Sequence, residues 1–274
     1  MSAIIAGTYN SRDTGGIPLT AGGSTRAGVL YRSDALAGTT DDGIRTLTAS
    51  PIGTIVDFRS DFEKTGAPNR IGTARHFATV ELPLLDGSLT GMPSAAGLDE
   101  AAMRQVFARL PSLADIYIRM LGSAAGTFAE VARLVARPSD ETHGGVLLHC
   151  TAGKDRTGVA VALLLDAAGA DRGAVIADYV LSETNLAGEW TEHMLARLKS
   201  WGAPLIPAIT DLVTATPPEA IKAAFAWLDE RGGSGEYLRG GGLSDADLSA
   251  LRARIAGDPR ADAADGGHDG SHLR

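Results

Sequence analysis

The sequence predicts an α/β fold with a mostly parallel central sheet and helices on both of its faces. The main observation is the order of strand, polar loop and buried helix over residues 145–168. Gly145–His149 is a short apolar run typical of a strand, and Val159–Ala168 is almost entirely apolar, as expected of a helix buried on all sides. A second apolar run, Ile52–Phe58, is typical of a buried strand. Strands and helices that follow one another in this way favour a sheet covered by layers of helices.

Local signals place the other elements. Residues 1–28 are rich in Gly, Thr and Ser and are expected to be irregular. A long helix is expected from Ser112, in the N-cap position, to about Arg137. Its apolar residues keep helical spacing and are assigned to the core: Leu113, Ile116, Tyr117, Met120, Ala124, Phe128, Val131 and Val135. The remaining expected elements are strands at Val29–Tyr31 and near Ala78–Leu85, and helices beginning near Thr40, Asp171, Pro217 and Ser244.

The composition is that of a soluble globular protein, with 274 residues of which 44% are hydrophobic and 21% charged. The apolar pattern ends near residue 256, so we expect one domain over residues 1–256 and a disordered tail over 257–274. No uncharged apolar run reaches the roughly 18 residues of a membrane span. The N-terminus lacks the basic start and apolar core of a signal peptide. We expect a cytoplasmic protein without integral membrane contact, and export without a cleaved signal peptide stays open.

Charge and cysteine content narrow the function classes. The formal net charge is −8 and no Lys/Arg-rich run offsets it, which argues against a nucleic-acid partner. Cys150 is the single cysteine of the chain, so no intramolecular disulfide forms. The neighbours of Cys150 must decide whether it is a buried small hydrophobe or a reactive group.

The segment around Cys150 has the features of an anion-binding nucleophile loop. It reads Cys150, five residues, Arg156, then Thr157-Gly158, and it lies between the apolar strand and the buried helix. A thiolate is the nucleophilic form of cysteine, and inward N–H groups of a loop together with a helix N-terminus stabilise negative charge. The planar fork of Arg156 binds two phosphate oxygens at once. The pattern predicts attack on a phosphate ester by Cys150.

Other residues of the loop have expected parts in the same site. Thr151, Ala152, Gly153 and Lys154 surround the phosphate, and the Thr157 hydroxyl hydrogen-bonds the cysteine sulfur when it leaves. His149 either orients the loop through its ring nitrogens or is a satisfied structural histidine. A nucleotide-binding P-loop is a poor match because Lys154 is followed by Asp155 rather than Ser or Thr. One cysteine without a patterned histidine pair does not make a zinc site, so no metal is expected.

This segment resembles the active-site loop of the cysteine-based protein tyrosine phosphatases. Its Gly153–Gly158 variant is similar to the mycobacterial protein tyrosine phosphatase B type and related bacterial enzymes, which act on phosphoproteins and phosphoinositides. The likeness extends over most of the chain. Further landmarks match at Asn10–Gly16, Tyr31–Asp34, Asp57–Ser60, Ala177–Tyr179 and Gly235–Arg239.

The resemblance implies a two-step hydrolysis through a phosphocysteine on Cys150, without metal or cofactor. It implies phosphotyrosine substrates, extended to phosphoserine, phosphothreonine and phosphoinositides. The subgroup is thought to use an aspartate inside the phosphate loop as general acid, which favours Asp155. Asp86, on a loop after a strand, is the alternative acid. A non-catalytic phosphate-binding module on the same fold is the alternative function, and a sulfur-transfer enzyme is a weaker one.

Three further expectations come with the resemblance. Lys154 is associated in the subgroup with phosphoinositides, or else it contributes to the field that keeps Cys150 ionised. Residues 186–222 correspond to a helix pair that covers the active site, with Leu195, Leu198 and Trp201 as the face that docks on it. A permanently packed helix pair is the alternative. The matching landmarks also contain residues expected to be structural or to contact the phosphate loop or a head group: Arg12, Asp13, Arg59 and Glu63.

Overall fold

The computed structural model describes residues 3–84, 110–138, 142–200 and 204–256. The described residues contain a five-stranded sheet in the order β1-β2-β5-β3-β4. Strands β2, β5, β3 and β4 are parallel to one another, and β1 is an antiparallel edge strand. The expected mostly parallel sheet is therefore confirmed. The strands are β1 Arg12–Asp13, β2 Leu30–Ser33, β3 Ile52–Asp57, β4 Ala78–Glu81 and β5 Gly145–His149.

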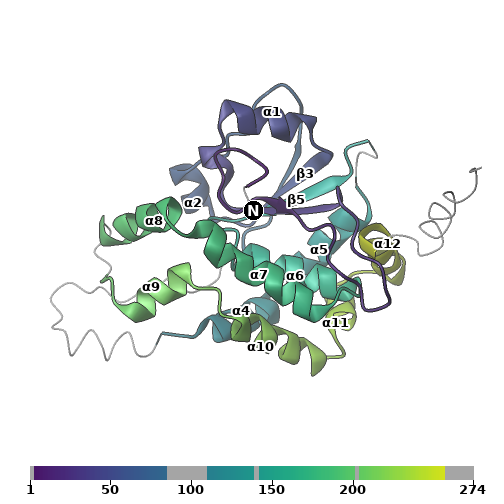
Figure 1. The fold of residues 1–274 in the computed structure, drawn as a ribbon. Helices are drawn as coiled ribbons and strands as arrows, with labels where there is room; N and C mark the ends of the chain where they lie inside the picture. Colours follow the sequence, from purple (N-terminus) through teal and green to yellow (C-terminus); the bar gives the residue numbers. More distant parts are fainter. Residues whose placement is uncertain (1–2, 85–109, 139–141, 201–203, 257–274) are drawn as a thin grey trace, which may run out of the picture.

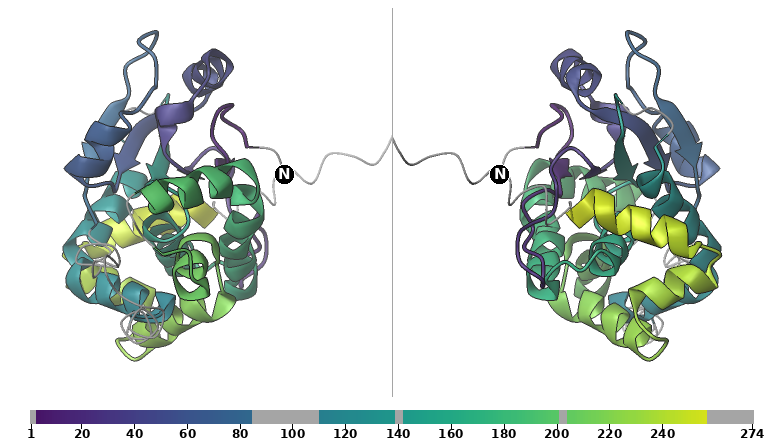
Figure 2. Two further views of the ribbon diagram at one scale, coloured as in Figure 1. Left: turned by 90° about the vertical axis from the view of Figure 1, so that its left-hand side faces the viewer. Right: turned by 90° about the vertical axis from the view of Figure 1, so that its right-hand side faces the viewer.

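Helices lie on both faces of the sheet, as expected, but they are divided unequally between them (Figure 1). One face is covered by α1 and the short 3-10 helix η1, while the other carries α4 to α7 and α10 to α12 (Figure 2). The helices are η1 Leu36–Gly38, α1 Asp41–Ala49, α2 Asp61–Gly66, α4 Leu113–Ser123, α5 Ala125–Ala136, α6 Arg156–Ala167, α7 Arg172–Leu186, α8 Glu189–Ser200, α9 Pro207–Thr214, α10 Pro218–Asp229, α11 Ser234–Gly240 and α12 Asp245–Ala256. No helix within these described ranges has both the length and the apolarity needed to cross a membrane.

The central strand β5 is buried on both faces, which explains its uninterrupted apolar sequence. Val146 and Leu148 belong to the large core beneath α5 and α6, whereas Leu147 packs with Leu36 and Leu47 in the smaller core beneath η1 and α1. This alternation is the two-residue period of a strand. Burial on both sides fixes the register of β5, and with it the point at which the chain leaves the sheet after His149.

Helix α6 follows the loop and is buried along its whole length, as predicted, with Asp166 as its one residue outside the core. It begins at Arg156, so the arginine of the motif lies in its first turn. The helix therefore starts inside the loop motif, earlier than its apolar run.

Two expectations about the chain are wrong. The long helix expected from Ser112 to Arg137 is two helices, α4 and α5, which join at Ala124 with φ −126° and ψ 25°. An alanine at this position does not indicate that a helix ends there. The two halves instead pack on different partners, α4 against α10 and α5 against α11 and α12. Residues 1–28 are also not wholly irregular, because Arg12 and Asp13 pair with β2.

A buried ion triad ties β1 and β2 to α7 near the loop. Asp178 Oδ1 accepts from Arg12 Nε and Asp178 Oδ2 from Arg32 Nη1, each at 2.6 Å. Burial alone would raise the pKa of Asp178, but the charges of Arg32 and Arg12 outweigh it and lower that pKa. Arg32 also donates through Nη2 to the carbonyl of Gly153, at 2.7 Å. The triad therefore holds the loop as well as the helix.

Replacing Asp178 by Asn should destabilise the fold strongly. The change leaves two buried guanidinium groups without their carboxylate, and breaking a buried ion network in this way costs about 3–5 kcal/mol. Urea unfolding measures the loss. The matched control is Asp229→Asn, which removes a carboxylate that is 52% exposed beside Arg172. Exposed pairs contribute at most about 1 kcal/mol, so equal losses in the two variants would contradict a structural role for the triad.

Candidate active site

The loop from Cys150 to Arg156 joins the end of β5 to the start of α6. Cys150 is buried, and its Sγ accepts a hydrogen bond from the backbone N–H of Gly153 at 3.2 Å. The sulfur thus lies inside the curve of its own loop. A backbone amide at a helix N-terminus presents positive partial charge to a sulfur that accepts from it.

The carbonyl groups of the loop are held on its outer side. The carbonyl of Thr151 accepts from the N–H of Ala35 at 3.1 Å, and the carbonyl of Ala152 accepts from Asn10 Nδ2 at 3.0 Å. The third in succession, that of Gly153, accepts from Arg32. Because the carbonyl and N–H of one peptide unit point in opposite directions, three outward carbonyls turn the following N–H groups inward. The arrangement is an anion-binding nest.

Gly153 is required by the curvature of the loop. Its φ is +68°, in the left-handed region, and a Cβ built there would lie 2.4 Å from the carbonyl oxygen of Ser33. No other residue avoids both the backbone strain and the clash with β2. The neighbour that excludes a side chain at this position is therefore the backbone of β2.

Arg156 is anchored by a carboxylate from another element. Its Nη1 and Nη2 donate to Glu63 Oε2 and Oε1 at 2.8 and 2.7 Å. Glu63 lies in the first turn of α2 and also completes a capping box with Ser60. Burial alone would raise the pKa of Glu63, but the hydrogen bonds and charge of Arg156 outweigh it and hold the pKa far below its ordinary value. Glu63 also accepts from the hydroxyl of Thr151, so one carboxylate binds both ends of the loop.

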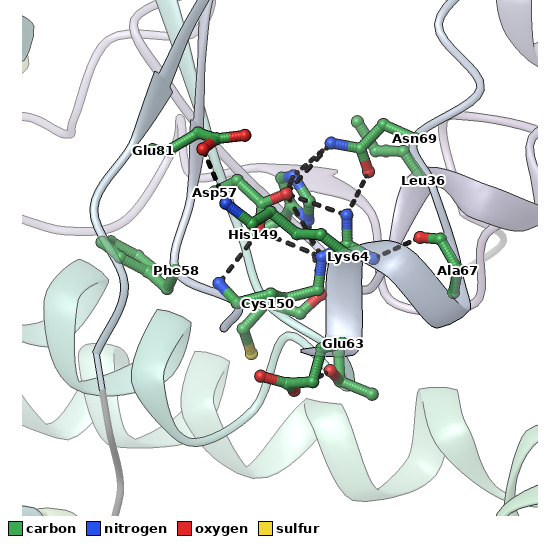
Figure 3. Close-up of polar contacts among 12 residues, drawn as sticks. Leu36, Asp57, Phe58, Glu63, Lys64, Ala67, Asn69, Glu81, His149 and Cys150 are labelled. Carbon is green, nitrogen blue, oxygen red and sulfur yellow. Dashed lines mark hydrogen bonds and ion pairs between the residues drawn. The ribbon is translucent and has the colours of Figure 1, made fainter. Parts of the chain in front are cut away.

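A buried polar cluster supports the strand end from which Cys150 emerges (Figure 3). Arg59 pairs with Asp57, with Nη2 and Oδ2 2.8 Å apart, and Asn69 bridges that carboxylate to His149. The other ring nitrogen, His149 Nδ1, lies 3.3 Å from the carbonyl oxygen of Cys150. Burial lowers the pKa of His149 to about 4, so the ring is neutral at pH 7. Its contacts combine the two alternatives left open by the sequence: the histidine is structural and it orients the loop.

Asp155 is the N-cap residue of α6, yet its side chain makes no capping hydrogen bond. Aspartate at this position normally accepts from the amides of the first turn. Here Oδ1 accepts instead from the hydroxyl of Tyr117, at 2.7 Å, and the side chain is 20% exposed. The carboxyl group is thus beside the loop and accessible, as a general acid requires. The alternative acid, Asp86, lies outside the described residues.

Lys154 points away from the nest, toward the C-terminal end of α9. Its Nζ donates to the carbonyls of Leu212 at 3.0 Å and Ala215 at 2.8 Å, and it lies 3.5 Å from Asp155 Oδ1. A positive charge is stabilised at this end of a helix. Lys154 is therefore part of the loop, but its ammonium group contacts the helix pair of residues 186–222.

The first residues of the helix pair contact the loop. Leu186 and Trp190 pack with Ala152 of the loop. The face expected to dock on the site behaves differently, because Leu195 and Leu198 pack with Ile209 and so join α8 to α9. Trp201 lies outside the described residues.

Thr157 is buried, and its hydroxyl has no hydrogen-bond partner among the described residues. An unpartnered buried hydroxyl costs about 1–3 kcal/mol of folding free energy, so a residue with a purely structural role would be expected to avoid it.

Among the residues that the structure describes, no group of three His, Cys, Asp or Glu side chains is arranged to hold a metal ion.

The apolar stripe in the sequence places Tyr117 in the core but does not predict its contact with Asp155. The stripe assignment is correct for its ring, which is fully buried. A tyrosine in a core stripe is itself a signal, because its hydroxyl needs a partner wherever the ring is buried. The Ala177–Tyr179 landmark was the second signal, since Tyr179 OH lies 2.8 Å from Tyr117 OH.

Comparisons with known proteins point to one family. The model of the tyrosine phosphatase family matches residues 4–257. A putative tyrosine-protein phosphatase from Cupriavidus necator is 31% identical, over 89% of this chain and 84% of its own length. A triple specificity protein phosphatase, PtpB, from Mycobacterium tuberculosis is 29% identical over 92% of this chain and 98% of its own. A tyrosine-protein phosphatase from Nostoc commune is 26% identical over 84% and 74%.

The family match spans nearly the whole described chain, including the loop, the buried helix after it and the strands that hold it. This protein belongs to the tyrosine phosphatase family.

Proposed function

We propose that this tyrosine phosphatase hydrolyses phosphate monoesters with Cys150 as nucleophile, Arg156 as phosphate ligand and Asp155 as general acid. The observation that carries the proposal is the nest itself. Three successive loop carbonyls are bound from outside, so the loop amides face the sulfur that would attack. The family comparisons favour an enzyme over a non-catalytic binding module on the same fold.

In the first step the Cys150 thiolate attacks phosphorus and the bond from phosphorus to the ester oxygen breaks. Asp155 gives its proton to the departing oxygen, so the leaving group departs as a neutral alcohol or phenol. In the second step water attacks the phosphocysteine and gives a proton to the Asp155 carboxylate. The sulfur–phosphorus bond breaks, and the products are inorganic phosphate and the Cys150 thiolate. The buried Thr157 hydroxyl is available to donate to that thiolate as it leaves.

Arg156 and the loop amides stabilise the oxygens of the phosphoryl group as it transfers. A guanidinium has five N–H donors in a fixed plane. Glu63 accepts from two of its nitrogens and so fixes the plane before substrate arrives. Donors that are already oriented need no reorganisation in the transition state, which is why such groups lower barriers strongly. Glu63 is thus a positioning residue for Arg156.

Cys150→Ser should abolish turnover of an aryl phosphate and leave binding of a phosphotyrosine peptide intact, because the nest amides and Arg156 remain. Arg156→Ala should lose roughly 10²–10³-fold in kcat, the usual effect of removing one key oxyanion donor. Steady-state kinetics and isothermal titration calorimetry measure the two effects. Activity that persists in Cys150→Ser, or wild-type activity that a chelator removes, would contradict the proposal.

Asp155→Asn should slow esters of poorly acidic phenols most, because their oxygen needs a proton in order to leave. The expected loss for phenyl phosphate is roughly 10²-fold or more, within the range of general acid catalysis. Asp86→Asn, measured alongside, should keep the leaving-group dependence of the wild type. The opposite pair of results would move the acid to Asp86.

The substrate range proposed here includes phosphotyrosine, phosphoserine, phosphothreonine and phosphoinositides. One relative is named a triple specificity phosphatase, and the loop carries a second cation, Lys154. Within the described residues the hydrogen-bond partners of its ammonium group are neutral carbonyls at the end of α9. An additional phosphate on an inositol ring is a stronger partner for that ammonium than a carbonyl.

Lys154→Met should lower kcat/KM for a vesicle-borne phosphoinositide by roughly tenfold more than for a phosphotyrosine peptide, the effect of one charge-assisted hydrogen bond. Lys222→Met, which removes a lysine that is 57% exposed on α10, is the control for charge alone. Parallel assays on peptide and vesicles give the ratio. An equal loss on both substrates would show that Lys154 acts on the loop in general and has no lipid-specific part.

A further inference from the structure

We propose that Tyr117 and Tyr179 are positioning residues that hold Asp155 so that one carboxyl oxygen, Oδ2, carries the proton to the leaving group. The inference rests on the proposed function, because it assigns a device to the general acid named there. The two tyrosines come from different helices, α4 and α7, and meet at the start of α6.

The three groups form a hydrogen-bonded chain with one direction. The hydroxyl of Tyr117 has a single hydrogen, and it donates this to Asp155 Oδ1 at 2.7 Å. The hydroxyl of Tyr179 lies 2.8 Å from that of Tyr117. Since the hydrogen of Tyr117 is already given to the carboxylate, Tyr179 is the donor in the second bond. The chain thus runs from Tyr179 through Tyr117 to one oxygen of Asp155.

The two carboxyl oxygens of Asp155 are made unequal by these contacts. Oδ1 accepts from Tyr117 and also lies 3.5 Å from the ammonium of Lys154. A proton on Oδ1 would face a donor hydrogen and a positive charge, so protonation there is disfavoured. Among the described residues, no side chain or amide is paired with Oδ2. The proton of the acid form therefore resides on Oδ2, the oxygen that protein contacts leave for the substrate.

Both tyrosines stay protonated when the enzyme works. Burial raises the pKa of Tyr117 well above its ordinary value, and the negative charge of Asp155 raises it further. Burial and the same charge raise the pKa of Tyr179. Each hydroxyl is therefore a hydrogen-bond donor over the whole neutral range, and neither competes with Asp155 as an acid.

Close packing fixes the chain in place. The two rings meet edge to face with centroids 6.1 Å apart. A Cβ on Gly158 would lie 3.1 Å from Tyr179 Cδ2, so glycine in the first turn of α6 leaves room for that ring. Tyr179 also follows Asp178, whose partner Arg32 holds the carbonyl of Gly153. Helix α7 thus supports the nest with one residue and the acid with the next.

The test is the leaving-group dependence of kcat/KM in Tyr117→Phe, because kcat/KM reports the step in which the ester oxygen departs. We expect a loss of about tenfold for phenyl phosphate, a fraction of the whole effect of a general acid, and almost none for 2,4-dinitrophenyl phosphate, whose phenolate leaves without a proton. Tyr179→Phe should show the same trend with a smaller loss. A merely structural role would lower both substrates alike.

Tyr237→Phe is the matched control. It removes another buried tyrosine hydroxyl, one that donates to the carbonyl of Leu121 at 2.6 Å, near the C-terminal end of α4. We expect a loss of stability and an unchanged leaving-group dependence. Circular dichroism and thermal unfolding monitor all variants. If Tyr117→Phe does not fold, the leaving-group dependence of Tyr179→Phe decides the inference.

A double-mutant cycle separates this inference from the proposed function. In an Asp155→Asn background, Tyr117→Phe should add nothing to the leaving-group dependence, because the group it positions is gone. If Asp155→Asn steepens that dependence while Tyr117→Phe and Tyr179→Phe leave it at the wild-type value, the inference fails and the acid assignment stands. If Asp155→Asn itself changes nothing, both fail together.

Discussion

The site depends on the outward fixation of the loop carbonyls between Cys150 and Arg156. A peptide unit that is bound through its carbonyl on one side presents its N–H on the other. Asn10 and Arg32 supply two of these contacts, and Arg32 is itself held by Asp178. The loop carbonyls are therefore held outward by a buried amide and by a buried ion network. In a buried triad the attraction between the charges can do no more than offset the cost of removing them from water. Such a triad can still be required for the geometry of the loop.

The ionisable groups around the nest differ in the partners that hold them. Glu63 neutralises and orients Arg156. Lys154, the second cation of the loop, is directed to the end of α9. His149 is buried and neutral at pH 7, so it supports the strand end without adding charge beside the sulfur. Asp155, the proposed acid, is 20% exposed, and its Oδ1 accepts from the hydroxyl of Tyr117 and lies 3.5 Å from the ammonium of Lys154.

Much of this arrangement was predictable from local sequence. The parallel sheet, the loop and the buried helix follow from apolar runs of different length, and the roles proposed for Cys150 and Arg156 follow from the residues of the loop itself. The helix break at Ala124 and the strand pairing of Arg12 were not predictable, because alanine does not indicate a break and arginine does not indicate a strand. The break comes from the different helices that α4 and α5 pack against, and the pairing comes from the neighbouring strand β2. Leu195 and Leu198 form an apolar face, as predicted, but this face packs against α9 rather than against the active site.

By itself, the sequence determined the nucleophile loop and the layers that present it, because these depend on residue order and on the periods of strand and helix. Only the tertiary structure decided what the flanking groups do. Lys154 and Asp155 are neighbours in the chain, yet one binds α9 and the other binds Tyr117 on α4. The physical reason is that a side chain's partner is set by packing between elements distant in sequence. The sequence predicted the amide nest, whereas the pairing of Tyr117 and Tyr179 beside Asp155 was decided by the packing of α4 and α7.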